Sequence, residues 1–120
     1  MLKFSTSLKK NHEFRRLYSR GKSAATPLLV VYCLKNGHNY NQIGITVTKK
    51  LGKAVQRNRV RRRLKEIYRL SEEKFSVGYN IIVVARTKSR YASFSQLRRA
   101  FLGACSGLGL LAERGGVGAS

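Results

Sequence analysis

The fold is decided by residues 43–85, which read IGITVTKKLGKAVQRNRVRRRLKEIYRLSEEKFSVGYNIIVVA. Residues 43–48 have the composition of a strand, and residues 79–85 form a continuous apolar run typical of a central strand covered on both faces. Between them, apolar side chains recur at helical spacing and predict a helix over about 54–70. A strand, a long helix and a strand in succession predict a crossover unit, which by default is right-handed.

The other elements are short and surround one small sheet. We expect a helix at 11–20, a brief strand at 22–25 and an apolar strand at 28–34, whose hairpin partner after the Asn36-Gly37 turn would be 43–48. Gly44 within that partner indicates a bulge or a close approach of another backbone. Ser93 or Ser95 can cap a last helix, with a buried stripe of Leu97, Ala100, Phe101 and Ala104. The sequence therefore predicts one α+β domain over residues 1–111 and a flexible glycine-rich tail over 112–120.

The charge balance points to a polyanionic partner. The chain has 120 residues and a formal net charge of +20, and it contains no Asp. Between Lys49 and Arg69 there are ten Lys or Arg residues and one Glu. Nothing inside the protein can neutralise this charge, so nucleic acid or an anionic membrane must be considered.

One side of the predicted helix 54–70 carries the polar and basic side chains Asn58, Arg59, Arg61, Arg62, Lys65 and Arg69. Arginine presents a planar fork of donors that suits phosphate oxygens, so this face can follow a phosphate ridge. A merely solvated face would mix both signs of charge, which this one does not. A helix lying on a membrane surface is a further reading, but the apolar stripe has the width expected for packing on a sheet. No run approaches the roughly 20 apolar residues that span a bilayer, so we expect no membrane association.

Aromatic residues give a second signal. Phe14 and Tyr18 share one face of the predicted first helix, and Tyr32 lies in the first long strand. They could simply pack in the core. Alternatively, they form a partly open surface on which unpaired nucleotides stack, each such contact being worth about 1–3 kcal/mol.

Catalytic chemistry has few candidates in this chain. Two-metal phosphoryl chemistry needs clustered carboxylates, and only Glu72 and Glu73 are adjacent, where helical neighbours do not face one site. His12 and His38 have no ligand-like companions. The two isolated cysteines have no metal-ligand spacing and are typical of reduced, buried thiols in a cytoplasmic protein. We therefore expect no catalytic residue and no metal site on the protein.

Residues 49–62, KKLGKAVQRNRVRR, resemble the signature of the bacterial ribonuclease P protein subunit, including its Arg-Asn-Arg helix. Residues 14–21, FRRLYSRG, are similar to that family's early aromatic element, and the resemblance covers about residues 5–108. It implies an α-β-β-β-α-β-α two-layer sandwich with a small mixed sheet and a left-handed βαβ crossover, against the default hand.

The resemblance also implies a function. Members assist the endonucleolytic removal of 5′ leaders from precursor tRNA, while the chemistry belongs to a catalytic RNA with Mg²⁺ held mainly by that RNA and the substrate. It implies a face for the RNA subunit formed by Arg57, Asn58, Arg59, Arg61, Arg62 and Lys65. It implies a site for the 5′ leader formed by Phe14, Tyr18, Tyr32, Lys49, Lys50 and Lys53. No obligate protein partner is expected.

Two other classes of protein remain as alternatives. A ribosomal-type structural RNA-binding protein would not need Phe14 and Tyr18 accessible together. A stand-alone RNA nuclease would cleave RNA with Mg²⁺ and no RNA subunit.

Overall fold

A computed structural model describes residues 2–112 of the chain. Within these residues it contains a five-stranded sheet in the order β1-β4-β5-β3-β2. The strands are β1 (Ser5–Ser7), β2 (Lys22–Ala25), β3 (Leu29–Lys35), β4 (Asn41–Val47) and β5 (Tyr79–Ala85). The α-helices are α1 (Asn11–Arg20), α2 (Ala54–Ser71) and α3 (Phe94–Gly107), and short 3-10 helices are η1 (Lys49–Leu51), η2 (Glu72–Lys74) and η3 (Thr87–Tyr91). The predicted α+β class is confirmed, whereas the hand of the β4–α2–β5 crossover stays a prediction.

The predicted hairpin between 28–34 and 43–48 is wrong, because β5 lies between β3 and β4. β5 pairs antiparallel with β3 and parallel with β4. Consecutive residues Ile81, Ile82 and Val83 are all buried, so this strand needs cover on both faces, and pairing on both edges satisfies its backbone. The hairpin neighbour of β3 is β2 instead.

The connection from β3 to β4 crosses the start of β5 and is fixed there by hydrogen bonds. The backbone N–H of Asn36 donates to the Gly78 carbonyl oxygen over 2.9 Å, and its side-chain amide donates to Asn80 Oδ1 over 3.0 Å. The Asn36-Gly37 turn thus lies in a connection that crosses β5 and does not form a tight hairpin.

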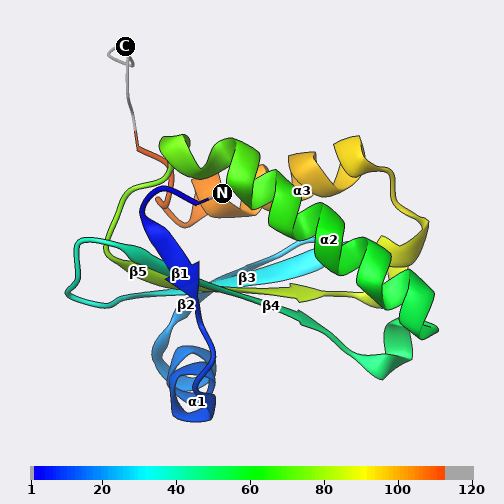
Figure 1. The fold of residues 1–120 in the computed structure, drawn as a ribbon, viewed down its shortest axis with the longest axis horizontal. Helices are drawn as coiled ribbons and strands as arrows, with labels where there is room; N and C mark the ends of the chain where they lie inside the picture. Colours follow the sequence, from blue (N-terminus) through cyan, green and yellow to red (C-terminus); the bar gives the residue numbers. More distant parts are fainter. Residues whose placement is uncertain (1, 113–120) are drawn as a thin grey trace.

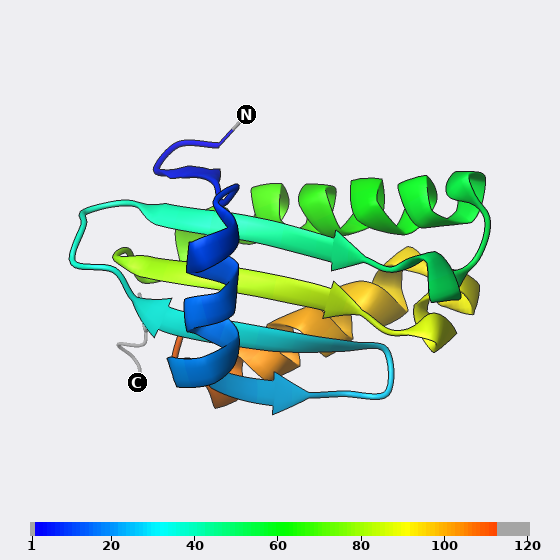
Figure 2. The same cartoon turned by 90° about the horizontal axis from the view of Figure 1, so that it is seen from below.

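Helices lie on both faces of the sheet (Figure 1). α2 and α3 cover one face, where Val31, Ile81 and Val83 point into the main core. α1 crosses the strands on the other face (Figure 2), where Ile82 packs with Leu17 in a smaller cluster. The alternation along β5 therefore divides the apolar side chains between two layers.

The helical stripes lie as predicted. On α2, Val60, Leu64, Ile67 and Tyr68 are buried, and on α3 Leu97, Phe101 and Ala104 are buried with Ala100 partly covered. Of the two candidate caps, Ser93 is the one used, because its hydroxyl oxygen accepts the Gln96 N–H over 3.1 Å.

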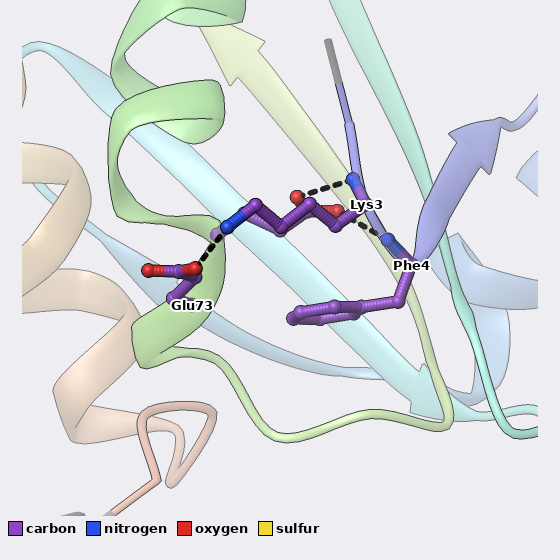
Figure 3. Close-up of polar contacts among 4 residues, drawn as sticks. Lys3, Phe4 and Glu73 are labelled. Carbon is purple, nitrogen blue, oxygen red and sulfur yellow. Dashed lines mark hydrogen bonds and ion pairs between the residues drawn. The ribbon is translucent and has the colours of Figure 1, made fainter.

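Strand β1 was not expected, since its sequence is Ser-Thr-Ser and covers three residues. It pairs parallel with the start of β4. The Glu72 carboxylate is 2 % exposed and accepts the backbone N–H of Lys3 over 2.7 Å and that of Phe4 over 3.0 Å. Figure 3 shows these bonds beside the ion pair between Lys3 and Glu73. η2, which directly follows α2, therefore fastens the N-terminal segment to the edge of the sheet.

Burial alone would raise the pKa of Glu72, but hydrogen bonds from Ser5 and from the backbone of Lys3 and Phe4 hold that pKa below its ordinary value. Beside it, the buried Asn41 donates to the Ser76 carbonyl oxygen over 3.0 Å and accepts the Tyr79 N–H over 2.9 Å. These two residues satisfy the buried polar groups where β1, β4 and β5 begin.

Residues 113–120 of the predicted tail lie outside the described residues, so the domain boundary and the tail's flexibility stay predictions.

Candidate nucleic-acid interface

The side of α2 that faces away from the sheet carries the predicted basic face. Asn58, Arg59, Arg62 and Lys65 are exposed, and Arg61 is half-buried. Asn58 has a visible role here, because its side-chain oxygen accepts a hydrogen bond from the Arg61 guanidinium over 3.1 Å. This hydrogen bond restricts the conformations of the Arg61 side chain. The guanidinium therefore loses little conformational entropy when it binds a phosphate.

Two arginines on the flanks of α2 are tied to the protein itself. Arg57 donates from Nε to the Gly52 carbonyl oxygen over 3.2 Å, and Arg63 donates to the Ala92 carbonyl oxygen over 2.9 Å. Both residues are half-buried, so their stems lie against the protein. The Arg57 side chain is therefore bound to the turn at Gly52, which precedes α2. The other five residues predicted for this face, all within the described part of the chain, make no side-chain hydrogen bond to that turn.

The three predicted aromatic residues gather on the other face of the sheet, where α1 crosses it. The rings of Tyr18 and Tyr32 meet edge to face with centroids 4.9 Å apart, and Tyr18 is 44 % exposed. Phe14 is half-buried and packs with Tyr32 against the small cluster of Leu8, Leu17 and Ile82. The aromatic site is thus both part of a core and open on one side, and the stacking of nucleotides on it stays a prediction.

Gly44 makes room for Phe14. A Cβ atom at position 44 would lie 2.9 Å from Phe14 Cζ. The close approach predicted at this glycine is therefore made by an aromatic ring rather than by another backbone.

The three predicted lysines lie together beyond the C-terminal end of β4. Lys49 and Lys50 are in η1, Lys53 precedes the first residue of α2, and all three are exposed. At about 3.3 Å per residue along a strand, Lys49 lies about 16 Å from Gly44 in the direction of β4. The lysines therefore extend the aromatic site along the sheet and do not surround it.

One group of basic residues at this end was not selected from the sequence. η3 packs beside η1, and Arg90 donates to the Leu51 carbonyl oxygen over 3.0 Å. Arg86 donates to the Thr26 carbonyl oxygen over 3.1 Å. The parallel pairing of β4 and β5, which the predicted crossover unit implies, brings the segments after both strands to one place.

Within residues 2–112, no three His, Cys, Asp or Glu side chains come together in an arrangement that could hold a metal ion. None of the helices in this part of the chain is both long and apolar enough to cross a membrane.

These features define a small α+β protein whose candidate surfaces have the chemistry of an RNA-binding protein: exposed arginines on one helix and open aromatic rings on the opposite face. The family model described as Ribonuclease P matches residues 2–108. The chain belongs to the ribonuclease P protein family, which confirms the resemblance given above.

Individual relatives agree. The chain is 48% identical over 101 residues to the ribonuclease P protein component of Alkaliphilus oremlandii, covering 84% of this chain and 89% of that protein. It is similar to the solved RNase P protein of Staphylococcus aureus, with a TM-score of 0.81 and 29% identity over 92% of this chain and 99% of that one. For the RNase P protein from Thermotoga maritima the TM-score is 0.74 and the identity 32%, over 81% and 92% of the two chains.

Family membership makes this chain a protein component of ribonuclease P, a tRNA-processing endoribonuclease, and the comparisons support this prediction over the ribosomal alternative.

Proposed function

We propose that this protein contacts two RNAs at once within the ribonuclease P holoenzyme. The exposed side of α2 binds the catalytic RNA subunit through Asn58, Arg59, Arg61, Arg62 and Lys65, with Arg57 contributing at the start of the helix. The aromatic site on the other face binds the 5′ leader of precursor tRNA through Phe14, Tyr18 and Tyr32, and Lys49, Lys50 and Lys53 bind its backbone.

The observation that carries the proposal is the placement of these surfaces on opposite faces of one sheet. α2 lies on one face and α1 on the other (Figures 1 and 2). Tyr32 of β3 packs with Phe14 and Tyr18 of α1 on that second face. A protein only about one sheet and two helices thick can then separate two polyanions and contact both.

The physical contribution of the protein is positioning and charge compensation. The side chains named above are donors and stacking platforms, and within residues 2–112 no three His, Cys, Asp or Glu side chains come together as metal-assisted phosphoryl transfer by the protein would need. We therefore assign the hydrolysis to the RNA subunit and to Mg²⁺ held by RNA. Positive charge between two RNAs lowers their repulsion, which matters most when Mg²⁺ is scarce.

Reconstitution tests the proposal. The purified chain is mixed with a bacterial ribonuclease P RNA at low Mg²⁺, and cleavage of precursor tRNA is measured. We expect stimulation by the chain, and no cleavage by the chain with Mg²⁺ alone. Absence of stimulation would contradict the proposal, and cleavage without the RNA subunit would favour a stand-alone nuclease.

Two variants separate the two surfaces. Phe14→Ala should weaken binding of precursor tRNA relative to mature tRNA, whereas Tyr18→Phe should keep it because the ring remains. Arg59→Ala should weaken assembly with the RNA subunit, with Arg98→Ala on α3 as a control of equal charge. If Phe14→Ala lowers both binding steps equally, or unfolds the chain, the leader assignment fails.

Salt gives an independent measure. If about six phosphates are neutralised on assembly, the logarithm of the affinity should fall with the logarithm of salt concentration at a slope of about −4 to −5. An affinity independent of salt would rule out charge-driven docking.

A further inference from the structure

A hollow lies at the end of the molecule where β3 begins and α3 starts. Its volume is about 550 Å³. The turn of residues 26–28 forms one wall, η3 forms another, and the first two turns of α3 close it. The proposed function leaves this hollow unused, because none of its lining residues belongs to the aromatic site or to the basic face of α2.

An exposed aromatic ring stands at the rim of this hollow. Tyr91 is 77 % exposed, the largest fraction among the exposed large apolar side chains of the described residues. The Arg90 guanidinium lies 4.7 Å from the centroid of its ring, and Arg90 is in turn bound to the Leu51 carbonyl oxygen. One face of the ring is thus held by an anchored cation. A ring held in this way can stack a flat partner at little additional entropic cost.

The rest of the lining combines apolar and cationic groups. Pro27, Leu28 and Ala100 supply an apolar floor, while Lys88 and Arg99 supply positive charge. The sequence has no Asp or Glu between Lys22 and Lys65 or between Lys74 and Ala112, so all three walls come from stretches without acidic residues. The occupant must therefore be anionic and must also carry a flat or apolar part.

We propose that this hollow binds one or two unpaired nucleotides of RNA. A base stacks on the free side of Tyr91 and covers Leu28, while the adjoining phosphates meet Lys88 and Arg99. An acidic peptide would satisfy the charge, but it would leave the anchored ring without a flat partner. A free phosphate would leave the apolar floor uncovered. A single strand of RNA supplies both features in one chain, as in other sequence-tolerant stacking sites.

The strand has two possible sources with the same chemistry: the precursor's leader beyond its proposed contact at the aromatic site, or an unpaired segment of the RNA subunit. Either would enter over η1 and η3, where Lys50 and Arg86 lie at the ends of parallel strands.

Photocrosslinking tests the proposal on the full chain. The probe is a single-stranded RNA of about twelve nucleotides with scattered 4-thiouridine, a length within the range of known single-strand sites. Crosslinked peptides are mapped by mass spectrometry. We expect crosslinks within residues 86–100 in addition to those at the aromatic site. The same mapping on the holoenzyme, with the label placed first in the leader and then in the RNA subunit, assigns the source, and a crosslink within 86–100 in either arm supports the site.

Matched variants make the result specific. Tyr91→Ala and Arg99→Ala should each lower the crosslink yield within residues 86–100 at least about fivefold, which corresponds to about 1 kcal/mol. Tyr91→Phe keeps the ring and should keep the yield. Arg98→Ala removes the same charge from the next position of α3, outside the hollow, and should also keep it.

Absence of crosslinks within residues 86–100, or an equal loss in the Arg98 and Arg99 variants, would overturn the proposal. Because Tyr91 is so exposed, its truncation should leave thermal unfolding unchanged, and a folding defect that accounts for the lost yield would also count against it. With a labelled probe short enough to bind only this hollow, Phe14→Ala should not change this yield, so failure of the leader assignment and failure of this inference are distinguishable.

Discussion

The contact between Gly44 and Phe14 allows a quantitative test of how the aromatic site is built. Position 44 lies outside the left-handed region of backbone conformation, so alanine is compatible with its backbone. The added Cβ would lie 2.9 Å from Phe14 Cζ and 3.2 Å from Cε1. The ring must therefore retreat by about 0.5 Å to reach an ordinary contact distance, and it forfeits part of its packing on the strand.

Gly44→Ala should have opposite effects with and without the ring. With Phe14 present, overpacking costs about 1–3 kcal/mol, offset by about 0.4–1 kcal/mol from the lower entropy of the unfolded chain. In the Phe14→Ala background the overpacking disappears, so the same change should stabilise the fold by about 0.4–1 kcal/mol. The two substitutions should therefore show a coupling free energy of about 1–3 kcal/mol.

Urea unfolding of the four proteins, followed by circular dichroism, measures this coupling. Sulfate concentration is held constant, because anions that bind the folded state shift its apparent stability. A coupling below about 0.5 kcal/mol would refute the reasoning, since it would mean that the ring does not rest on Gly44 in solution.

Other substitutions test the rest of the fold. Asn41→Leu should destabilise the chain by about 3–5 kcal/mol in urea unfolding, because it leaves the Tyr79 N–H and other buried polar groups without partners; a loss under 1 kcal/mol would contradict this. The folded state lowers the pKa of Glu72, so its stabilisation is present above the ordinary pKa of about 4.5 and is lost as the pH falls below it. Glu72→Gln should therefore be less stable than the parent at pH 7, with the difference shrinking in acid; a constant difference would show that the charge is not involved. Ser93→Ala should cost about 0.5–2 kcal/mol and Ser95→Ala should be nearly neutral in the same assay, and equal effects would show that α3 is not capped as described.

The elements of this fold could be predicted from local sequence, but part of its topology could not. The helical spacing of apolar residues predicts the helix of residues 54–71. A continuous apolar run predicts the strand of residues 79–85. Local sequence does not predict the neighbours of β3, because a turn signal such as Asn36-Gly37 indicates a change of direction but not which strand pairs next. The pairing is set by burial of β5 on both faces, which depends on residues 38 or more positions apart.

Strand β1 escaped prediction for a related reason. Ser5, Thr6 and Ser7 have no apolar pattern, and the carboxylate that fastens this segment belongs to Glu72. A contact between positions so distant in sequence leaves no local signal, although the unusual adjacency of Glu72 and Glu73 in a chain this basic was visible.

The candidate site could likewise be predicted in its local features but not in its long-range contacts. Residue types and helical spacing were sufficient to select the basic face of α2 and the aromatic pair on α1. They could not show that Arg57 and Arg63 are bound to backbone carbonyls, or that Tyr91 stands open beside Arg99. Exposure of a single ring is decided by how η3 and α3 pack, which is a property of the assembled fold.

The central position of β5 also governs how the chain can fold during synthesis. The strand at the middle of the sheet is made after both of its neighbours, so a nascent chain that ends before Tyr79 has two separated edges and a gap where the core should be. α2 is complete by then and can lie against β4, yet β5, which supplies Ile81 and Val83 to the main core, has not been made. Non-local pairing of this kind delays folding until the last partner is present. Both candidate surfaces therefore gain the support of a complete sheet only once residues 79–85 have been made.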